Sequence, residues 1–252
     1  MAKPTVFITG ASSGIGESLA RLYASRGYQV GLAARRQDHL DKLAAGLTPK
    51  PDIYALDVRD AVALKQAASD FISRHGAPDI VIANAGVSRG TLTEIEDDLA
   101  AFQDTFDINV MGMVNTFHPF IVPMQAAGKG TLVGIASVAG FRGIPGGGAY
   151  SASKAAAIKY CESLRVELRA SGISVVTICP GYIRTPMTAV NKFKMPFLID
   201  VDEAVKRFAR AIDAKTSFTV IPWSMGIVAR ILRMVPNWLY DRVFSHMPRK
   251  PR

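Results

Sequence analysis

Short apolar runs alternate with longer segments of helical periodicity along most of this chain, and the alternation repeats five times. Runs that are apolar at every position indicate strands buried on both faces of a sheet. Successive strands separated by helix-length segments are joined by right-handed crossovers, which makes the strands parallel. The pattern therefore predicts an α/β fold, with a doubly wound parallel sheet and helices on both of its faces.

The predicted elements follow from where these runs begin and end. The strands are expected at Thr5–Thr9, Gln29–Ala34, Asp52–Leu56, Asp79–Ala83, Gly130–Ala136 and Ile173–Cys179. The helices are expected at Ile15–Arg26, Gln37–Leu47, Ala61–His75, Leu99–Ala127 and Tyr150–Ser171. Glycines stand just past four of these helices, where C-terminal glycines belong: Gly27, Gly76, Gly128 and Gly172. Because no repeat or linker divides the pattern, we expect one domain over residues 1–221.

The charge of the chain is unevenly distributed. Its 252 residues include 30 Lys plus Arg and 21 Asp plus Glu, a net charge of +9. Residues 222–252 contain six basic residues and one acidic residue, so this segment contributes +5 and the rest of the chain only +4. A positive surface attracts anions such as phosphorylated cofactors, acidic lipids or nucleic acid.

Composition limits the class of protein further. Hydrophobic residues make up 49% and charged residues 20%, which excludes a disordered or fibrous chain. Two cysteines, Cys161 and Cys179, are too few for a disulfide framework and fit a reducing compartment. The apolar run before Gly10 is too short for a signal peptide, and no charge-free apolar stretch reaches the roughly 18 residues of a spanning helix. We therefore expect a cytoplasmic enzyme-sized domain.

Two binding classes are not expected. The four histidines, His39, His75, His118 and His246, lack ligand spacing, so no metal site is predicted. The body does not interleave aromatic with basic residues as single-strand nucleic-acid platforms do, so no nucleic-acid partner is predicted.

A glycine-rich turn follows the first predicted strand. It reads Thr9-Gly10-Ala11-Ser12-Ser13-Gly14-Ile15-Gly16, and a predicted helix follows at once. Its glycines allow a tight turn and a close approach of the backbone to a ligand. The N–H groups and the positive dipole at the start of the helix suit a pyrophosphate. A strand before and a helix after are the context in which such a turn binds a dinucleotide.

The end of the second strand bears on which dinucleotide is bound. It reads Ala33-Ala34-Arg35-Arg36, without the acidic residue that binds the ribose 2′-hydroxyl of NAD. Arg35 and Arg36 can pair with the 2′-phosphate of NADP, whereas the alternative is a solvated charge pair at a helix start. The missing acid and the arginines favour NADP(H) over NAD(H).

Tyr150 and Lys154 lie four residues apart at the start of the last predicted helix, so they share one face of it. A free tyrosine has a pKa of about 10, and a nearby cation lowers that pKa by favouring the phenolate. Most such pairs are exposed surface pairs. Here Ser137 ends the preceding strand, at the edge where ligands bind in sheets of this type. Its hydroxyl can donate to a substrate carbonyl whose oxygen gains negative charge.

Two further segments have residues of interest. Asn84-Ala85-Gly86 follow the fourth strand and are small enough to let a ligand approach the backbone. Asn109 lies inside the long helix Leu99–Ala127, where asparagine is a mediocre helix former and invites a functional explanation.

Together these motifs resemble the short-chain dehydrogenase/reductase family over about residues 5–190. The glycine turn is similar to the family's cofactor turn, Asp57 to the acid that contacts the adenine, and Asn84-Ala85-Gly86 to its Asn-Ala-Gly segment. Pro180-Gly181-x-Ile183-x-Thr185 is similar to the loop that holds the nicotinamide carboxamide. Two positions depart from the family pattern: Ala83 replaces a frequent asparagine, and Ser13 stands where many NADP-dependent members have Lys or Arg.

The resemblance implies a Rossmann-type domain with a catalytic set of Asn109, Ser137, Tyr150 and Lys154. Tyr150 is expected to exchange the proton with the substrate, Lys154 to lower its pKa and hold the ribose hydroxyls, Ser137 to polarise the substrate and Asn109 to anchor a relay water. The expected cofactor-binding residues are Gly10, Ser12, Ser13, Gly14, Ile15, Gly16, Arg35, Arg36, Asp57, Val58, Asn84, Ala85, Gly86, Tyr150, Lys154, Pro180, Gly181, Ile183 and Thr185. Among the residues expected to select NADP, Arg35 leads, with Arg36, Ser12 and Ser13 as helpers.

Residues 186–200 are expected to form a substrate lid, as in the family. The apolar residues of this segment favour a lipophilic substrate, although packing against the body explains them equally well: Met187, Phe193, Met195, Phe197 and Leu198.

Residues 222–252 are expected to form a basic amphipathic helical extension. Met225, Val228, Ile231, Leu232 and Val235 fall on a helical stripe, and a second short amphipathic piece follows Pro236. A basic helix with an apolar face and a tryptophan suits a membrane interface, and it suits a partner subunit or packing on the body as well.

The expected function is that of an NADP(H)-dependent oxidoreductase that interconverts a ketone and a secondary alcohol, in the direction of reduction. The alternatives are an NAD-dependent alcohol dehydrogenase of the same family and a non-catalytic dinucleotide sensor or scaffold. The resemblance implies a homodimer or a homotetramer.

Overall fold

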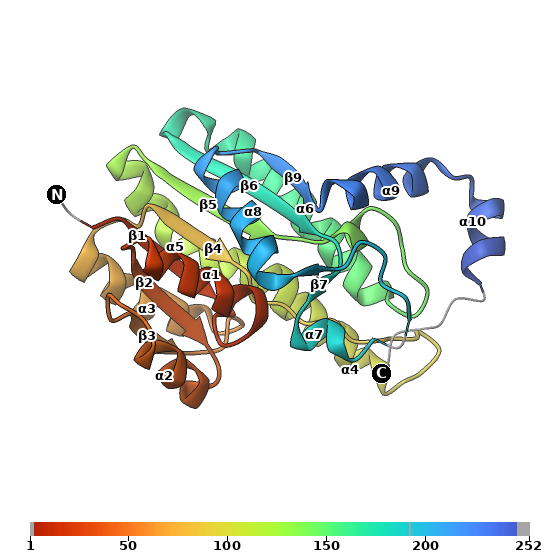
Figure 1. Cartoon of the computed structure of the whole chain (residues 1–252), viewed down its shortest axis with the longest axis horizontal. Helices are drawn as coiled ribbons and strands as arrows, with labels where there is room; N and C mark the ends of the chain where they lie inside the picture. The colour runs from red at the N-terminus through yellow and green to blue at the C-terminus, as the bar shows by residue number, and fades with distance from the viewer. Residues whose placement is uncertain (1–2, 192, 246–252) are drawn as a thin grey trace.

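The computed structural model describes residues 3–191 and 193–245 of the chain. Within these ranges, seven parallel strands form one sheet in the order β3-β2-β1-β4-β5-β6-β9, and β7 pairs with β8 in a separate short sheet (Figure 1). The strands are β1 Thr5–Thr9, β2 Gln29–Ala34, β3 Asp52–Ala55, β4 Ile80–Ala83, β5 Gly130–Ile135, β6 Ile173–Pro180, β7 Ile183–Arg184, β8 Ile199–Asp200 and β9 Phe218–Ile221. The order reverses between β1 and β4, which is the point where ligands bind in such sheets.

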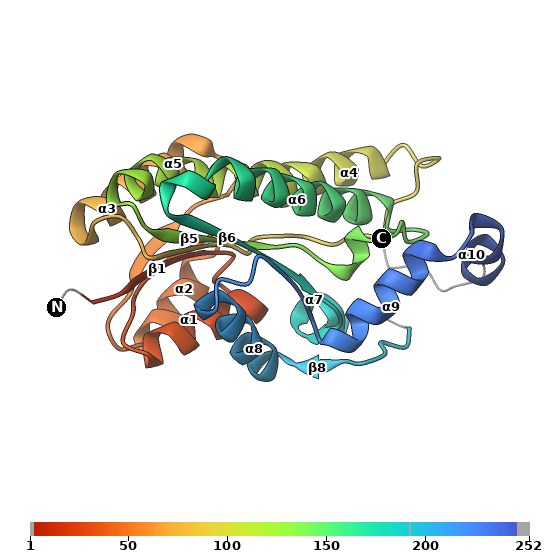
Figure 2. The ribbon, with the colours of Figure 1, turned by 90° about the horizontal axis from the view of Figure 1, so that it is seen from above.

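Helices cover both faces of the sheet (Figure 2). One face is covered by α3, α4, α5 and α6, and the other by α1, α2 and α8. The helices are α1 Gly14–Ser25, α2 Gln37–Ala45, α3 Ala61–His75, α4 Asp98–Phe106, α5 Gly112–Ala127, α6 Gly148–Glu167, α7 Pro186–Ala189, α8 Val201–Asp213, α9 Trp223–Met234 and α10 Asn237–Phe244. The predicted doubly wound α/β fold is therefore confirmed.

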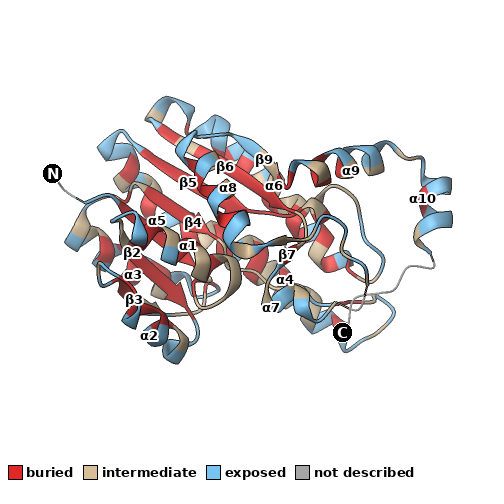
Figure 3. Ribbon diagram, viewed as in Figure 1, coloured by how far each residue is buried: buried red, intermediate tan, exposed pale blue. Residues whose placement is uncertain are grey.

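Two apolar layers form the core, one on each face of the sheet. The strands between them are buried along most of their length (Figure 3). Phe7, at the centre of β1, packs its ring against Phe71 of α3 and Phe120 of α5, with ring centroids 5.6 Å and 4.9 Å away. Gly31 of β2 leaves the space that Phe7 and Phe71 fill, because a Cβ there would lie 2.6 Å from the Phe7 ring. The buried layers hold the carboxyl ends of the strands in fixed positions.

The structure differs from the predicted elements at the middle helix and after β6, where the short elements β7, α7 and β8 were also not predicted. The expected helix Leu99–Ala127 is α4 and α5 joined by a π-helical turn, Asp107–Met111, which contains Asn109. Helix α8 and strand β9 were not predicted, although β9 completes the sheet beside β6. The predicted extension is helical as expected in α9 and α10, whereas residues 246–252 of that segment lie outside the described residues. Over the described ranges, the helices are too short or too polar to cross a membrane.

Candidate active site

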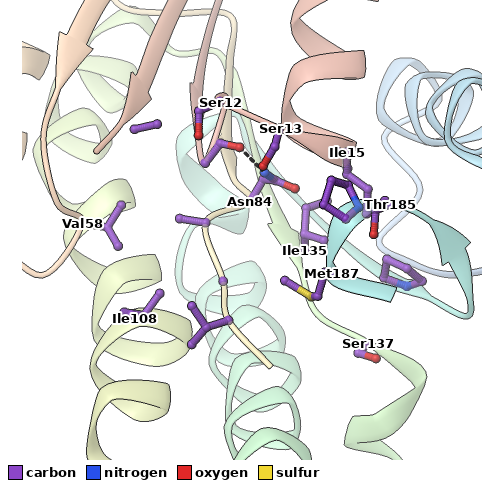
Figure 4. Close-up of a pocket in the computed structure, with 18 of the residues that line it drawn as sticks. Ser12, Ser13, Ile15, Val58, Asn84, Ile108, Ile135, Ser137, Thr185 and Met187 are labelled. Carbon is purple, nitrogen blue, oxygen red and sulfur yellow. Dashed lines mark hydrogen bonds between the residues drawn. The ribbon is translucent and has the colours of Figure 1, made fainter. Parts of the chain in front are cut away.

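A cavity of about 280 Å³ opens at the carboxyl ends of the strands (Figure 4). Its walls come from the glycine turn, the ends of β2 to β6 and the segment after β7. All of the expected cofactor residues except Gly16 line it, and so do Ser137, Tyr150 and Lys154. Gly16 and Asn109 lie behind its wall. The structure thus brings together residues that the sequence separates by more than 170 positions.

The glycine turn has the geometry of a phosphate cradle. Gly10 and Gly14 have φ angles of +68° and +58°, which favour glycine, and Gly16 packs directly on the Gly10 carbonyl, so a Cβ there would collide. The Ser13 side chain at the N-cap of α1 makes no capping hydrogen bond to the helix. The first N–H groups of α1 therefore remain available to an anion, and the residues present fit a dinucleotide.

Asn84 holds this turn against the neighbouring strand. Its Nδ2 donates to the carbonyls of Thr9 (3.0 Å) and Gly10 (3.2 Å), and its backbone N–H donates to the Thr9 hydroxyl (3.2 Å). Figure 4 shows Asn84 beside Ser12 and Ser13 on the cavity wall. The expected cofactor residue thus fixes the shape of the turn by tying β1 to β4.

Arg36, more than Arg35, contacts the glycine turn. Its Nη2 donates to the hydroxyls of Ser12 (3.0 Å) and Ser13 (3.2 Å), so a cation and two hydroxyls meet at the end of β2. Arg35 also lines the cavity, and its charge contributes to the lowered pKa of Asp57. The sequence favours Arg35 as the leading residue. The contacts instead put Arg36 at the centre of the cluster.

Asp57 is held ionised at the end of β3. Its carboxylate accepts from Arg59, with Nη2 2.8 Å from Oδ2, and these hydrogen bonds are the main cause of its lowered pKa. Arg59 also pairs with Asp104 of α4 at 3.0 Å. The carboxylate is fixed on the cavity wall where the resemblance implies the adenine.

Tyr150, Ser137 and Lys154 lie together at the start of α6. The hydroxyl of Ser137 is hydrogen-bonded to Tyr150, and it also accepts from the Ala139 N–H at 3.1 Å. Lys154 is buried, its Nζ lies 5.9 Å from the centre of the Tyr150 ring, and it donates to the Ile135 carbonyl at 2.9 Å. The expected juxtaposition of hydroxyl, phenol and ammonium is therefore present.

The pKa of Tyr150 is raised, whereas the sequence led us to expect a lowered pKa. Burial raises it, and the hydrogen bond from Ser137 opposes this rise only in part. Burial also lowers the pKa of Lys154, to about 8. Burial shifts both groups toward their neutral forms because the enclosed site stabilises charge poorly. Without a bound cofactor, Tyr150 is a protonated phenol and so a proton donor rather than a phenolate.

Asn109 clamps the loop after β4. Its Oδ1 accepts from the Val87 N–H (2.8 Å), and its Nδ2 donates to the Val87 carbonyl and to the Ser153 hydroxyl, both at 3.0 Å. Ser153 in turn donates to the Tyr150 carbonyl at 2.8 Å. The π-helical turn places this amide where a regular helix would not, and π-turns often occur at functional sites. The relay-water role of Asn109 stays a prediction.

Sequence reasoning missed Val87 and Ser153. Val87 acts through its backbone, for which the sequence carries no signal. Ser153 lies within Tyr150-Ser151-Ala152-Ser153-Lys154, and its spacing of three from Tyr150 was the available signal. Among the described residues, no group of three or more His, Cys, Asp or Glu side chains is placed to hold a metal ion.

The doubly wound sheet, the glycine turn and the Ser137–Tyr150–Lys154 group on the cavity wall define an NAD(P)-dependent oxidoreductase. Comparison with known proteins identifies the family: residues 4–195 match the model of short chain dehydrogenases. The chain belongs to the short-chain dehydrogenase/reductase family.

Individual relatives support the assignment to this family. An uncharacterized oxidoreductase of Myxococcus xanthus is 39% identical over 249 residues, which cover 96% of each chain. A short-chain dehydrogenase structure from Streptomyces avermitilis has the same fold, with a TM-score of 0.82 and 24% identity, covering 98% of this chain and 100% of that one. An actinorhodin polyketide ketoreductase determined with NADPH has a TM-score of 0.78 and 26% identity over 88% of this chain and 97% of its own.

Proposed function

We propose that this enzyme uses NADPH to reduce a lipophilic ketone to a secondary alcohol. The observation that carries the proposal is the position of the Tyr150 phenol, hydrogen-bonded to Ser137 on the wall of the cavity that the glycine turn borders, where burial raises its pKa. A protonated phenol next to a second hydroxyl suits the protonation of a carbonyl oxygen.

Each side chain of the site has its own role in the proposed reaction. NADPH, when bound, supplies the hydride to the carbonyl carbon. The Tyr150 hydroxyl transfers its proton to the carbonyl oxygen, while the Ser137 hydroxyl donates a hydrogen bond to the same oxygen as negative charge grows there. Lys154, in its protonated form, stabilises the phenolate left on Tyr150 and holds the ribose hydroxyls of the cofactor. Asn109 keeps the loop after β4 and Ser153 in position around these groups.

The preference for NADPH is supported by the cluster of Arg36, Ser12 and Ser13. A guanidinium with two hydroxyls binds a phosphate monoester well, whereas β2 ends without the carboxylate that would bind a ribose 2′-hydroxyl. The NADPH bound to the similar polyketide ketoreductase points in the same direction.

The lipophilic substrate is supported by the segment after β7. Pro186 and Met187 of α7 face the cavity, and Phe193 packs its ring 6.2 Å from that of Tyr182. We propose residues 186–200 as the lid over the substrate. Residues 1–221 are proposed to be the dinucleotide-binding and catalytic domain, in a cytoplasmic homodimer or homotetramer.

The test is NADPH consumption with a graded set of ketones, from short-chain to steroid-sized and acyl-chain compounds, compared with NADH. Tyr150→Phe should lower kcat by about 10²- to 10⁴-fold, because it removes the proton donor, and leave NADPH affinity nearly unchanged. Tyr160→Phe is the matched control, since Tyr160 lies on the same helix with its ring against Phe117.

Other outcomes would contradict the proposal. Normal turnover by the Tyr150→Phe variant would remove Tyr150 from the chemistry. NADPH binding without turnover of any ketone or alcohol would favour the sensor or scaffold. Faster turnover with NADH and NAD would favour the NAD-dependent alcohol dehydrogenase.

A further inference from the structure

Helix α9 is apolar on two opposite faces. Met225 and Ala229 face the body and are buried, while Trp223, Ile227, Ile231 and Met234 are exposed. These four exposed residues, here called the outer stripe, follow one another at spacings of four, four and three and so share one face of the helix. Trp223 and Met234 are 71% and 76% exposed. Of the expected amphipathic stripe, Met225 is buried while Ile231 belongs to the outer stripe, and no described residue covers the outer stripe.

Further apolar residues are exposed on α10, which follows α9 in the chain. Trp238 is 69% exposed, and Leu239 and Val243 are exposed as well. Figures 1 and 2 show α9 and α10 extending away from the body as an arm. Apolar side chains gathered on one such surface are typical of a surface that docks elsewhere.

The arm is held in a defined position. Arg142 donates to the carbonyls of Leu232 (2.9 Å) and Val235 (2.7 Å) at the end of α9, and its guanidinium lies 4.2 Å from the centre of the Tyr240 ring. Tyr240 donates to the Gly143 carbonyl at 2.6 Å. Since these contacts fix the arm, the exposure of the outer stripe is a property of the fold.

We propose that the outer stripe and the exposed face of α10 dock on an anionic lipid surface. Arg230 lies on the same side of α9 as the outer stripe, Arg233 and Arg242 are exposed on the arm, and residues 222–252 have a net charge of +5. Two copies of this chain joined through this face would bring two such positive segments together, whereas acidic lipid headgroups complement them. Tryptophans at both ends of an apolar, basic helical surface suit the interface between headgroups and acyl chains.

The arm also lies near the site. It follows β9 at the carboxyl ends of the strands, and its anchor Arg142 comes five residues after Ser137. Docking would therefore hold the cavity close to the lipid. That this position gives the enzyme access to a ketone dissolved in the lipid rests on the proposed function. The docking itself does not rest on it.

The chain offers a direct readout, because its two tryptophans, Trp223 and Trp238, both lie on the arm. Tryptophan fluorescence of the full chain is measured with vesicles of phosphatidylcholine, with and without phosphatidylserine, and co-sedimentation is measured in parallel. We expect a blue shift and sedimentation with the phosphatidylserine vesicles, both weakened by high salt.

Variants separate the apolar and electrostatic contributions. Ile227→Gln with Met234→Gln should abolish the blue shift. Arg230→Gln with Arg233→Gln should weaken binding by more than about tenfold, since each basic residue near an acidic surface contributes about fivefold. Val62→Gln, an equally exposed apolar position on α3, is the matched control and should bind as the unchanged protein does. NADPH binding confirms that each variant is folded.

Two results would overturn the proposal. Fluorescence and sedimentation unaffected by phosphatidylserine vesicles would exclude docking on anionic lipid. The second result is a blue shift of the tryptophan fluorescence that depends on protein concentration in the absence of vesicles. If the chain is then also a dimer that the Ile227 and Met234 substitutions dissociate, a second copy of the chain covers the outer stripe.

Discussion

Arg36 is the side chain that the proposed preference for NADPH singles out. Its contacts with Ser12 and Ser13 place one cation and two hydroxyls at the end of β2. Arg36→Ala should raise the KM for NADPH by about 10- to 100-fold, because a hydrogen bond to a charged group contributes about 1.5–3 kcal/mol to binding. The KM for NADH should stay nearly unchanged. Steady-state kinetics with both cofactors measure this. Arg21→Ala, which removes an exposed arginine paired with Glu17 on α1, should change neither. An equal loss with both cofactors would contradict the assignment.

Lys154 predicts how activity depends on pH. Burial lowers its pKa to about 8, so this lysine loses its charge as the pH rises through that value. If the ammonium is required, kcat/KM for NADPH, which reports on the free enzyme, should fall on the alkaline side with a midpoint near 8.

The matched variant for this prediction is Lys154→Arg. Arginine stays charged at these pH values, so the alkaline fall should move to higher pH even if the overall rate is lower. A fall that remains at the same pH in the arginine variant would assign it to another group.

The same titration has a consequence for stability. The pKa of Lys154 in the folded chain lies below its ordinary value of 10.5, so the folded state binds fewer protons than the unfolded state between about 8 and 10.5. The contribution of Lys154 to the free energy of unfolding therefore increases with pH across that interval.

For single residues, the sequence predicted which side chains meet in the cavity but not how the site shifts their pKa values. Motif spacing was sufficient to bring Ser137, Tyr150 and Lys154 to one cavity, because the ends of parallel strands share one edge. The direction of the Tyr150 pKa was wrong, since burial outweighs the effect expected from a neighbouring cation and burial cannot be derived from spacing. The contacts of Arg36 with Ser12 and Ser13 could not be derived from spacing either, because adjacent residues differ in side-chain direction, and the leading role expected of Arg35 stays a prediction.

At the scale of elements, the strand–helix alternation predicted the strands up to β6 well, whereas the elements between β6 and α9 were missed. The expected starts of β1, β2, β3, β5 and β6 agree with the structure. β9 has only four residues, Phe218–Ile221, and its pairing with β6 is a long-range contact that no local pattern indicates. Helix α8 carried a usable signal, because Ala204, Val205, Phe208, Ala209 and Ile212 recur with helical spacing. The π-turn at Asn109 has no such signature.

Arg142 couples two elements that are far apart in sequence. Arg142→Ala would remove the hydrogen bonds that satisfy the last carbonyls of α9 and the ring contact with Tyr240. We expect faster hydrogen exchange at the end of α9 and in α10, because the free energy of local unfolding there should fall by about 1–3 kcal/mol. Exchange in the rest of the chain should change little. Arg169→Ala, an exposed arginine beyond the other end of α6, is the control. Unchanged exchange in the arm would show that the inner apolar face holds α9 and α10 without Arg142.

At the scale of the whole molecule, the cavity draws on both halves of the sheet, so a bound cofactor should stabilise the entire fold. NADPH at about a hundred times its Kd should contribute about 2.7 kcal/mol, which for a chain of this size raises Tm by about 5–10 °C. Thermal unfolding with equal concentrations of NADPH and NADH measures this, and the rise with NADH should be smaller. Arg36→Ala should reduce the difference between the two. Equal rises in the unchanged protein would contradict a preference for the 2′-phosphate.

The pairing of β7 with β8 has a consequence for how this chain can be altered. Ile183 lies opposite Ile199 and Arg184 opposite Asp200, so the intervening residues leave and rejoin the body at adjacent points. A connection whose two ends are already side by side tolerates changes of length at small entropic cost. The segment between these strands can therefore vary in length while the sheet stays unchanged, and under the proposed lid role grafting other segments between Thr188 and Ile199 should change substrate preference.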